Sequence, residues 1–342
     1  MNVLYDGQIY TAQVTGGINR YFTNVINYLP HDAYPTLTTS YRRDKLSYPV
    51  HPNLTVREYR DFWPRRISNR VRSYYNQWVA SRPIFDIYHP TYYSQLTGSN
   101  LSDVRIPVVL TVYDMIHELF SDDLDQDGRT CALKREAIVA ADSILCISNS
   151  TKRDLLRYFP GAESKITVTY LASEFSRDLS YGDESVPSRP YFLYVGGRTK
   201  AYKNFDGLLR AFGKAATLNP HPLLVVVGGA FNEEEKRLIE QLNITNRIKN
   251  YGYVNDAYLA KLYRCSEAFV YPSLYEGFGI PPLEAMACGT VVIAANASSI
   301  PDIVGDAAIL FVPTVLKDLA DILLYFLDSP AHQARLSSKG YE

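Results

Sequence analysis

Glu276 and Glu284 enclose a glycine- and proline-rich segment, residues 277–282. The glycines keep a loop open so that backbone N–H groups can face a ligand, and the prolines fix the start of a following helix. A carboxylate in the loop could accept hydrogen bonds from sugar hydroxyls, and one in the first helical turns could bind a ribose diol. The simpler interpretations are a solvated turn carboxylate for Glu276 and an acid favoured by the helix dipole for Glu284.

A second candidate site is a cationic loop, residues 196–204, which follows a short apolar run. Its two glycines precede Arg198 and Lys203, and a helical pattern begins at Phe205. Cations at this place suit a diphosphate leaving group, because its negative charge grows as the bond to it breaks. A solvated basic loop is the alternative, and Lys200 is expected to face solvent in either case.

A glycine pair, Gly16 and Gly17, opens a helical pattern soon after the first apolar run. Glycines let backbone N–H groups approach a phosphate closely, and a helix N-terminus adds positive potential. The pair therefore predicts a phosphate contact, with an ordinary strand-to-helix turn as the alternative.

Short apolar runs alternate with helical patterns along the whole chain. The runs predict strands at 3–5, 85–88, 108–113, 144–147, 166–170, 191–195, 223–227, 268–271, 291–294 and 309–312. Near-continuous β-branched runs separated by helices indicate parallel strands buried on both faces. The pattern predicts an α/β protein built of two Rossmann-like, doubly wound parallel-sheet domains.

The polar, turn-rich segment 173–190 is typical of an interdomain linker. We therefore predict a first domain over 1–172 and a second over 191–325. In open α/β sheets ligands bind beyond the carboxyl ends of the strands, so two such domains facing a cleft would make a two-sided site closed by hinge motion.

The composition excludes several classes of protein. The chain is 46% hydrophobic and 21% charged, and its 35 basic and 36 acidic residues leave a net charge of −1, which argues against a nucleic-acid partner. Apolar runs stay well short of the roughly 18 residues that a membrane span needs, and the first residues lack a signal-peptide pattern. Four cysteines without CxxC spacing are typical of reduced thiols. A cytoplasmic protein is expected.

The block from Glu276 to Gly289 reads E-G-F-G-x-P-x-L-E-A-M-A-C-G and closely resembles the retaining family 4 glycosyltransferases, which include glycogen-synthase-like and mannosyltransferase-like enzymes. The resemblance covers nearly the whole chain, through GGINRY near the start, TVYD at 111–114, ISNSTKRDL at 147–155 and VGGRTKAYKN. It implies the GT-B fold and transfer of a hexose from a nucleotide diphosphate sugar.

The resemblance also implies roles for individual residues. Gly16 and Gly17 would meet the donor phosphates. Arg198 and Lys203 would clamp the diphosphate, and Glu276 would hold the donor hexose. The other residues implied to contact the donor are Gly197, Tyr253, Val254, Gly277, Phe278, Gly279, Ile280 and Glu284. Among these, residues 253 and 254 match the position of the base, and residue 284 that of the ribose.

The chain departs from the family pattern at two places. Tyr113 stands where many members have histidine, so we expect Asp114 first, and His117 second, to lie beneath the reacting carbon. His117 could equally be a packed or surface histidine. Family members usually continue with a helix that crosses back to the first domain, whereas this chain is expected to be shortened there, with residues 326–342 only beginning that return.

The segment Arg57–Arg82 is rich in arginine and aromatic residues. Apolar side chains at 67, 71, 74 and 78 follow helical spacing, and Trp63 precedes them. A basic amphipathic helix of this kind could lie on an anionic membrane. The simpler interpretation is an ordinary helix with a core face and a solvated face.

No catalytic metal is expected. Residues 123–128 begin like a calcium-binding EF-hand loop, but Lys134 stands where the twelfth-position glutamate is required. Arg198 and Lys203, together with helix N-termini, can do the charge work that a metal does elsewhere.

The expected function is transfer of a hexose, from UDP-glucose or GDP-mannose, to a saccharide or lipid-linked glycan in polysaccharide biosynthesis, without a cofactor. The enzyme would be cytoplasmic and peripheral on the inner face of the plasma membrane. Retention without an obvious nucleophile favours attack on the face that the phosphate leaves, while Glu276 as nucleophile stays open. The alternatives are a catalytically silent nucleotide-sugar-binding protein and another GT-B enzyme such as an epimerase.

Overall fold

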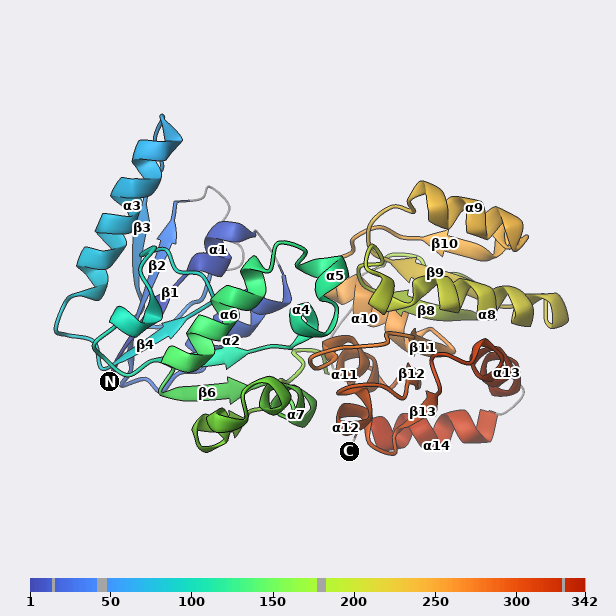
Figure 1. Cartoon of the computed structure of the whole chain (residues 1–342). Helices are drawn as coiled ribbons and strands as arrows, with labels where there is room; N and C mark the ends of the chain where they lie inside the picture. Colours follow the sequence, from blue (N-terminus) through green and yellow to red (C-terminus); the bar gives the residue numbers. More distant parts are fainter. Residues whose placement is uncertain (14–15, 42–47, 177–182, 328–329, 342) are drawn as a thin grey trace. The chain divides into compact units, whose positions relative to one another are not determined.

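The computed structural model describes residues 1–13, 16–41, 48–176, 183–327 and 330–341. The chain divides into two compact units, residues 1–170 and 171–342 (Figure 1). Part of the expected linker, residues 177–182, lies outside the described residues. Both units are built of parallel strands alternating with helices, so the predicted α/β class is confirmed.

The strands of the first unit all pair in parallel. They are β1 (Asn2–Asp6), β2 (Tyr34–Ser40), β3 (Thr55–Tyr59), β4 (Ile87–Pro90), β5 (Val109–Val112), β6 (Ser143–Cys146) and β7 (Ile166–Val168). They form two sheets, of order β3-β2-β1-β4 and β5-β6-β7. A parallel bridge between Tyr88 and Val108 connects the two sheets.

The helices of the first unit lie between these strands. They are α1 (Gln8–Ala12), α2 (Gly17–Asn27), α3 (Arg65–Ala80), α4 (Ile116–Leu119), α5 (Ser121–Leu124), α6 (Arg129–Ala140) and α7 (Asn149–Tyr158). The helix expected at 67–80 is present as α3, but its apolar positions 67, 71, 74 and 78 are exposed. It buries Ser68, Asn76 and Val79 instead. The helix thus has a buried face and a solvated face, and the apolar row lies on the solvated one.

The second unit contains one sheet of six parallel strands, of order β10-β9-β8-β11-β12-β13. The strands are β8 (Tyr191–Val195), β9 (Leu223–Val227), β10 (Ile248–Asn250), β11 (Ala268–Tyr271), β12 (Val292–Ala295) and β13 (Ala308–Phe311). Every residue of β9, which is entirely apolar, is buried. A continuous apolar run is what a central parallel strand needs, because helices cover both of its faces.

Most helices of the second unit connect successive strands, and the last two follow β13. They are α8 (Phe205–Leu218), α9 (Glu233–Gln241), α10 (Asp256–Arg264), α11 (Ile280–Ala287), α12 (Ile300–Val304), α13 (Leu316–Leu327) and α14 (Pro330–Tyr341). Helix α14 packs against α11, and the Ser337 hydroxyl donates to the carbonyl of Gly289 at 2.6 Å. The expected return of 326–342 to the first domain stays a prediction. Among the described helices, none is both long and apolar enough to cross a membrane.

Candidate active site

The loops identified from the sequence lie at the carboxyl ends of the strands in the six-stranded sheet of the second unit. All six strands are parallel, so the loops that follow them lie at one edge. Strand β8 is the first of this sheet along the chain, and the strand order reverses between it and its neighbour β11. Ligands of doubly wound sheets bind at such a reversal. The cationic loop 196–204 follows β8, and the Glu276 loop follows β11.

Lys203 and Glu276 meet at this reversal, although 73 residues separate them along the chain. The Lys203 Nζ donates to both Glu276 carboxylate oxygens, at 2.8 and 3.0 Å. The side chains are 23% and 12% exposed, so the pair is screened but reachable from solvent. A second link between the loops is the Leu274 N–H, which donates to the carbonyl of Tyr202 at 2.7 Å.

The loop that carries Glu276 is fixed by two serines at the end of β12. The Ser298 hydroxyl accepts from the Glu276 N–H at 2.8 Å and donates to its carbonyl at 2.5 Å. The Ser299 hydroxyl lies within hydrogen-bond distance of the carbonyls of Glu276 and Phe278, at 2.9 and 2.6 Å. Burial, followed by the Glu276 carboxylate, raises the pKa of Tyr271 well above its usual value. The backbone of Glu276 is thus held independently of its carboxylate.

The segment from Gly277 to Glu284 forms a turn and then α11. Gly279 precedes the helix with φ of +118°, a conformation that glycine adopts far more readily than other residues. Ile280 is the first residue of α11. Glu284 lies one turn into the helix and is buried, and the Tyr263 hydroxyl donates to its carboxylate at 3.3 Å. A ribose at Glu284 would therefore have to reach an acid that already has a partner.

Arg198 forms its ion pair with Glu235, whereas Lys203 pairs with Glu276. The Arg198 Nε donates to Glu235 at 2.9 Å, and one terminal nitrogen donates to the carbonyl of Gly229 at 2.7 Å. Its side chain is buried, with the guanidinium carbon 4.9 Å from the centre of the Phe231 ring. The charge of Arg198 is thus balanced inside the protein. The other terminal nitrogen, Nη1, is buried without a hydrogen-bond partner among the described residues, so a phosphate oxygen could take it while the pair with Glu235 stays closed.

The predicted base-binding residues lie beside the end of β9. Tyr253 is 87% exposed and Val254 is half-buried. A Cβ at Gly229 would lie 3.7 Å from the Tyr253 hydroxyl. A Cβ at Gly228 would lie 2.5 Å from the carbonyl of Gly196, so only glycine allows the loops after β8 and β9 to approach this closely. Gly197, next in the β8 loop, accepts from the Tyr194 hydroxyl at 2.9 Å.

In the first unit, Asp114 and His117 lie at the end of β5 around a buried lysine. The Lys134 Nζ donates to the Asp114 carbonyl at 3.1 Å and to Glu118 at 2.7 Å, and lies 3.8 Å from an Asp114 carboxylate oxygen. The His117 Nδ1 is buried without a hydrogen-bond partner among the described residues. Burial and the Lys134 ammonium lower the pKa of His117, so its imidazole is neutral near pH 7.

Tyr113 packs beneath this turn among aromatic rings. It is buried, its ring lies edge-on to Tyr21 with centroids 5.8 Å apart, and its hydroxyl donates to the Thr91 carbonyl at 3.4 Å. His89 is buried on the neighbouring strand β4, and its Nε2 forms a hydrogen bond with the Thr111 hydroxyl at 2.9 Å. Burial lowers the pKa of His89 to about 3.

The other phosphate candidates, Gly16 and Gly17, begin α2 at a solvent-exposed position. A Cβ on Gly17 would meet no atom of the described residues within 4 Å, so its backbone is open to a ligand on that side. Over the part of the chain that the structure describes, histidine, cysteine and acidic side chains form no cluster of three or more that could hold a metal ion.

Two family models match the chain in succession. The model described as Glycosyltransferase Family 4 matches residues 15–172, and the model described as Glycosyl transferases group 1 matches residues 181–342. The chain belongs to the group 1 glycosyltransferases. The family uses nucleotide-sugar donors and glycan acceptors.

Curated relatives of this glycosyltransferase include mannosyltransferases. It is 27% identical over 301 residues to O-antigen chain mannosyltransferase B of Escherichia coli, a match covering 84% of this chain and 74% of that one. It is 28% identical over 200 residues to the MMP alpha-(1->4)-mannosyltransferase of Mycolicibacterium hassiacum, covering 58% of this chain and 48% of that one.

Solved structures establish the GT-B fold of this glycosyltransferase. Sucrose-phosphate synthase from Thermosynechococcus elongatus superimposes with a TM-score of 0.76 at 19% identity, covering 99% of this chain and 92% of that one. Anabaena Alr3699/HepE in complex with UDP and glucose gives 0.76 at 18% identity, covering 100% and 94%. The predicted GT-B fold is confirmed.

Several residues of the glycosyltransferase site were not identified from the sequence. Glu235 is readable as half of a capping box with Asn232, but that motif does not say that it also pairs with an arginine. Lys134 carries no signal that separates it from a surface lysine. Ser298 lies in an ordinary turn sequence, and only the fold places it against Glu276.

Proposed function

We propose that this glycosyltransferase is a retaining, metal-independent hexosyltransferase that works without a cofactor in polysaccharide biosynthesis. The observation that carries the proposal is the Lys203–Glu276 pair at the strand-order reversal of the second sheet. In the free protein each charge satisfies the other. A donor could take both partners, with the ammonium turning to the diphosphate and the carboxylate accepting hydrogen bonds from hexose hydroxyls.

The proposed reaction is a substitution at the anomeric carbon on the face that the phosphate leaves. The bond from this carbon to the phosphate oxygen breaks, and its electron pair stays on that oxygen. The acceptor oxygen bonds to the same carbon, and its proton passes to the departing phosphate. Lys203 stabilises the charge that grows on the diphosphate, because the ammonium lies at the same sheet edge as the Glu276 loop.

Asp114 and His117 complete the proposed catalytic set. A neutral His117 could accept or donate a hydrogen bond without repelling a developing positive charge on the sugar ring. Asp114 offers a carboxylate that is partly exposed and oriented by the Ile116 N–H at 3.1 Å. Arg198 organises the loops after β8 and β9 in this proposal and offers the diphosphate its terminal nitrogen that has no partner among the described residues.

The donor is a UDP- or GDP-linked hexose. Mannosyltransferases among the relatives support GDP-mannose, and the UDP and glucose bound in the solved Alr3699/HepE structure support UDP-glucose. The acceptor is a saccharide or lipid-linked glycan. Since a lipid-linked acceptor is made at a membrane, the enzyme would act in the cytoplasm at the inner face of the plasma membrane.

A thermal-shift panel of UDP, GDP, ADP and their hexose conjugates tests the donor. A ligand that binds only the native state raises Tm by mass action, so one base and one sugar should give the largest shift. Donor hydrolysis then separates an enzyme from a silent binder, because an active transferase releases sugar to water. Binding without hydrolysis or transfer to any glycan would contradict the proposed activity, and absence of every shift would contradict the donor class.

A further inference from the structure

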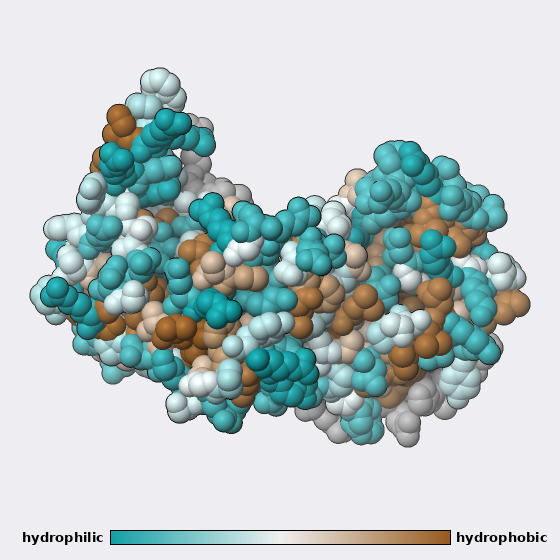
Figure 2. All heavy atoms as spheres, in the orientation of Figure 1, coloured by the Kyte–Doolittle hydropathy of each residue, from teal (hydrophilic) through white to brown (hydrophobic). Residues whose placement is uncertain are grey.

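The apolar side of α3 faces solvent. Trp63 is 87% exposed, Tyr74 is 64% exposed and Trp78 is 58% exposed, and Ile67 and Val71 continue the same row. We call these five residues the α3 stripe. Figure 2 shows hydrophobic atoms on the outer edge of this helix beside hydrophilic ones. Five large exposed apolar side chains in one row along a helix point to an interaction site.

The charges around the stripe are almost all positive. Helix α3 contains Arg65, Arg66, Arg70 and Arg72 and no acidic residue. Arg72 pairs with Asp61 at 3.4 Å, whereas the other three have no ion-pair partner among the described residues. A row of aromatic and aliphatic side chains flanked by unpaired arginines is the pattern of a helix that lies in a membrane interface.

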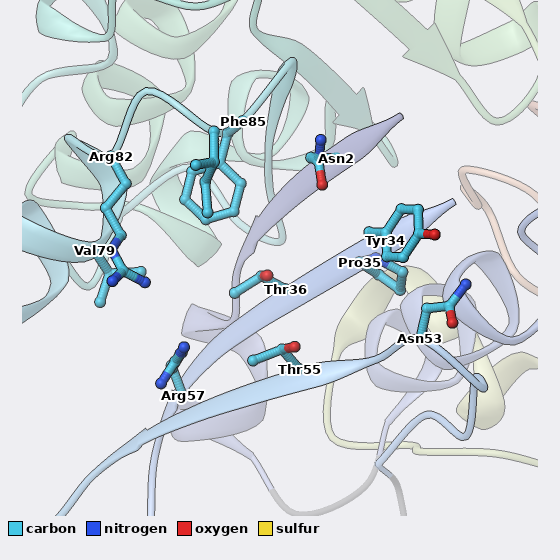
Figure 3. Close-up of a pocket in the computed structure, with 11 residues that line it drawn as sticks. Asn2, Tyr34, Pro35, Thr36, Asn53, Thr55, Arg57, Val79, Arg82 and Phe85 are labelled. Atoms are coloured by element: carbon cyan, nitrogen blue, oxygen red, sulfur yellow. The ribbon is translucent and has the colours of Figure 1, made fainter. Parts of the chain in front are cut away.

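A pocket of about 180 Å³ lies beside the end of α3, over the first halves of β1, β2 and β3 (Figure 3). Two arginines line it, Arg57 from β3 and Arg82 from the turn after α3, together with polar groups that include Asn2, Asn53 and Thr55. Among the residues that the structure describes, no acidic side chain lines it. Neither arginine has a carboxylate partner in the described parts of the chain, so the pocket offers unneutralised positive charge.

The pocket and the stripe are continuous. The guanidinium carbon of Arg82 lies 4.9 Å from the centre of the Trp78 ring, so one residue of the stripe stacks on one wall of the pocket. Ile84, which also lines the pocket, is exposed. An apolar surface that would enter lipid therefore adjoins a cationic pocket at the level where a headgroup would sit.

We propose that the α3 stripe and this pocket form a docking surface for an anionic phospholipid membrane, with the phosphate of one headgroup held by Arg57 and Arg82. Charge decides between a membrane and a second copy of the chain. Two copies meeting through α3 would bring together eight arginines and no carboxylate from the two helices. An anionic bilayer instead complements every unpaired arginine. The proposal adds a partner to the proposed function, and its own evidence does not depend on the catalytic residues.

The test is co-sedimentation of the full chain with phosphatidylcholine vesicles, with and without phosphatidylglycerol. The wild type is expected to bind only the anionic vesicles, and more weakly at high salt. Arg57→Ala combined with Arg82→Ala should lower the partition coefficient at least tenfold, because each arginine near the surface contributes about fivefold. Ile67→Ser combined with Tyr74→Ser should also release the protein. The matched controls are Lys214→Ala with Arg237→Ala, and Leu218→Ser, which change exposed residues of the second unit.

Several outcomes would overturn the docking surface. These are wild-type protein that ignores anionic vesicles, pocket variants that bind as well as the controls, and a dimer in solution that the stripe substitutions dissociate. Thermal stabilisation by inorganic phosphate without vesicle binding would also overturn it, because the pocket would then serve a soluble ligand. Hydrolysis of a soluble donor is measured on every variant. Its retention alongside lost vesicle binding separates this surface from the proposed function.

Discussion

Ion pairs at the carboxyl ends of strands differ between the six-stranded sheet of the second unit and the β5-β6-β7 sheet of the first unit. In the second unit, Lys203 and Glu276 form an ion pair that solvent can reach, and Ser298 fixes the loop that carries Glu276. In the first unit, beside the end of β5, Lys134 is fully buried and binds the backbone carbonyl of Asp114 as well as Glu118. The Lys203–Glu276 pair can exchange partners with a ligand at little cost in free energy. The contacts of Lys134 fix the geometry of the turn that carries Asp114.

Energetics explain this division. An ion pair near solvent contributes little to stability, so a donor can replace it without unfolding its surroundings. A buried pair is different, because removing one partner leaves an uncompensated charge in a medium that solvates it poorly. Burial therefore suits the Lys203 pair to ligand exchange and the Lys134 pair to a structural role. Substitutions at Lys203 and at Lys134 should separate these two roles.

The largest effect is expected from Lys134→Met. It would leave Glu118 buried without its cation and should lower the free energy of unfolding by about 3–5 kcal/mol. Chemical denaturation followed by fluorescence measures this loss. The double variant Lys134→Met with Glu118→Leu should recover most of it, because no unpaired charge remains. Equal destabilisation of the single and double variants would contradict the electrostatic explanation.

Lys203→Ala should act on turnover more than on stability. Loss of an ammonium that stabilises the leaving diphosphate is expected to slow transfer by about 10²–10³-fold, and Glu276→Ala should be at least as slow. The melting temperature should fall less than for Lys134→Met, because the Lys203 side chain is 23% exposed whereas that of Lys134 is 0% exposed. Lys200→Ala, an exposed lysine in the same loop, is the matched control. Full activity of either site variant would remove the pair from the mechanism.

The free energy of unfolding should also depend on pH through buried groups of the first unit. His89 has a pKa of about 3 when folded, against 6.5 when unfolded, so only the unfolded chain binds its proton between these values. Stability should therefore fall as pH drops below about 6.5, by up to about 1.4 kcal/mol per pH unit. Asp6 has the opposite sign, because burial raises its pKa from 3.8 to about 6 and the folded chain keeps the proton.

These two contributions oppose each other between about pH 4 and pH 6, so the wild type should show a shallow profile there. His89→Phe removes one of them. Relative to wild type, its unfolding free energy should increase as pH falls through this window, and denaturant titrations at several pH values measure the difference. A variant profile parallel to wild type would show that His89 titrates alike in both states.

How far the sequence alone predicts this molecule depends on where information is local. Continuous apolar runs identified β8, β9 and β11, because strands buried on both faces must be apolar. They missed β2, an interior strand whose buried residues include Thr38, Thr39 and Ser40, and β3, an edge strand with exposed and charged residues. Local composition carries no sign that such polar segments pair.

The candidate site shows the same limit. Lys203 and Glu276 were identified separately, by their loops and by the family resemblance, and only the fold makes them partners. Arg198 was expected to bind the diphosphate with Lys203, and the structure shows that it also pairs with Glu235 on α9. The sequence of the cationic loop alone does not predict this ion pair. The α3 stripe has the spacing of a core face, and spacing does not specify which side of a helix meets the sheet.

The smallest effect is expected from Tyr113→Phe. The tyrosine occupies the place where many family members have histidine, but here its ring packs against Tyr21 and its hydroxyl makes one long hydrogen bond of 3.4 Å to Thr91. Removing that hydroxyl should change the unfolding free energy by less than about 1 kcal/mol and leave donor hydrolysis within about twofold, since the ring keeps its packing. Tyr113→Leu, which loses the ring contacts, is the comparison for packing. A large loss of hydrolysis in the phenylalanine variant, with stability intact, would mean that the hydroxyl acts in the reaction. The chemistry at the end of β5 would then centre on Tyr113 instead of Asp114 and His117.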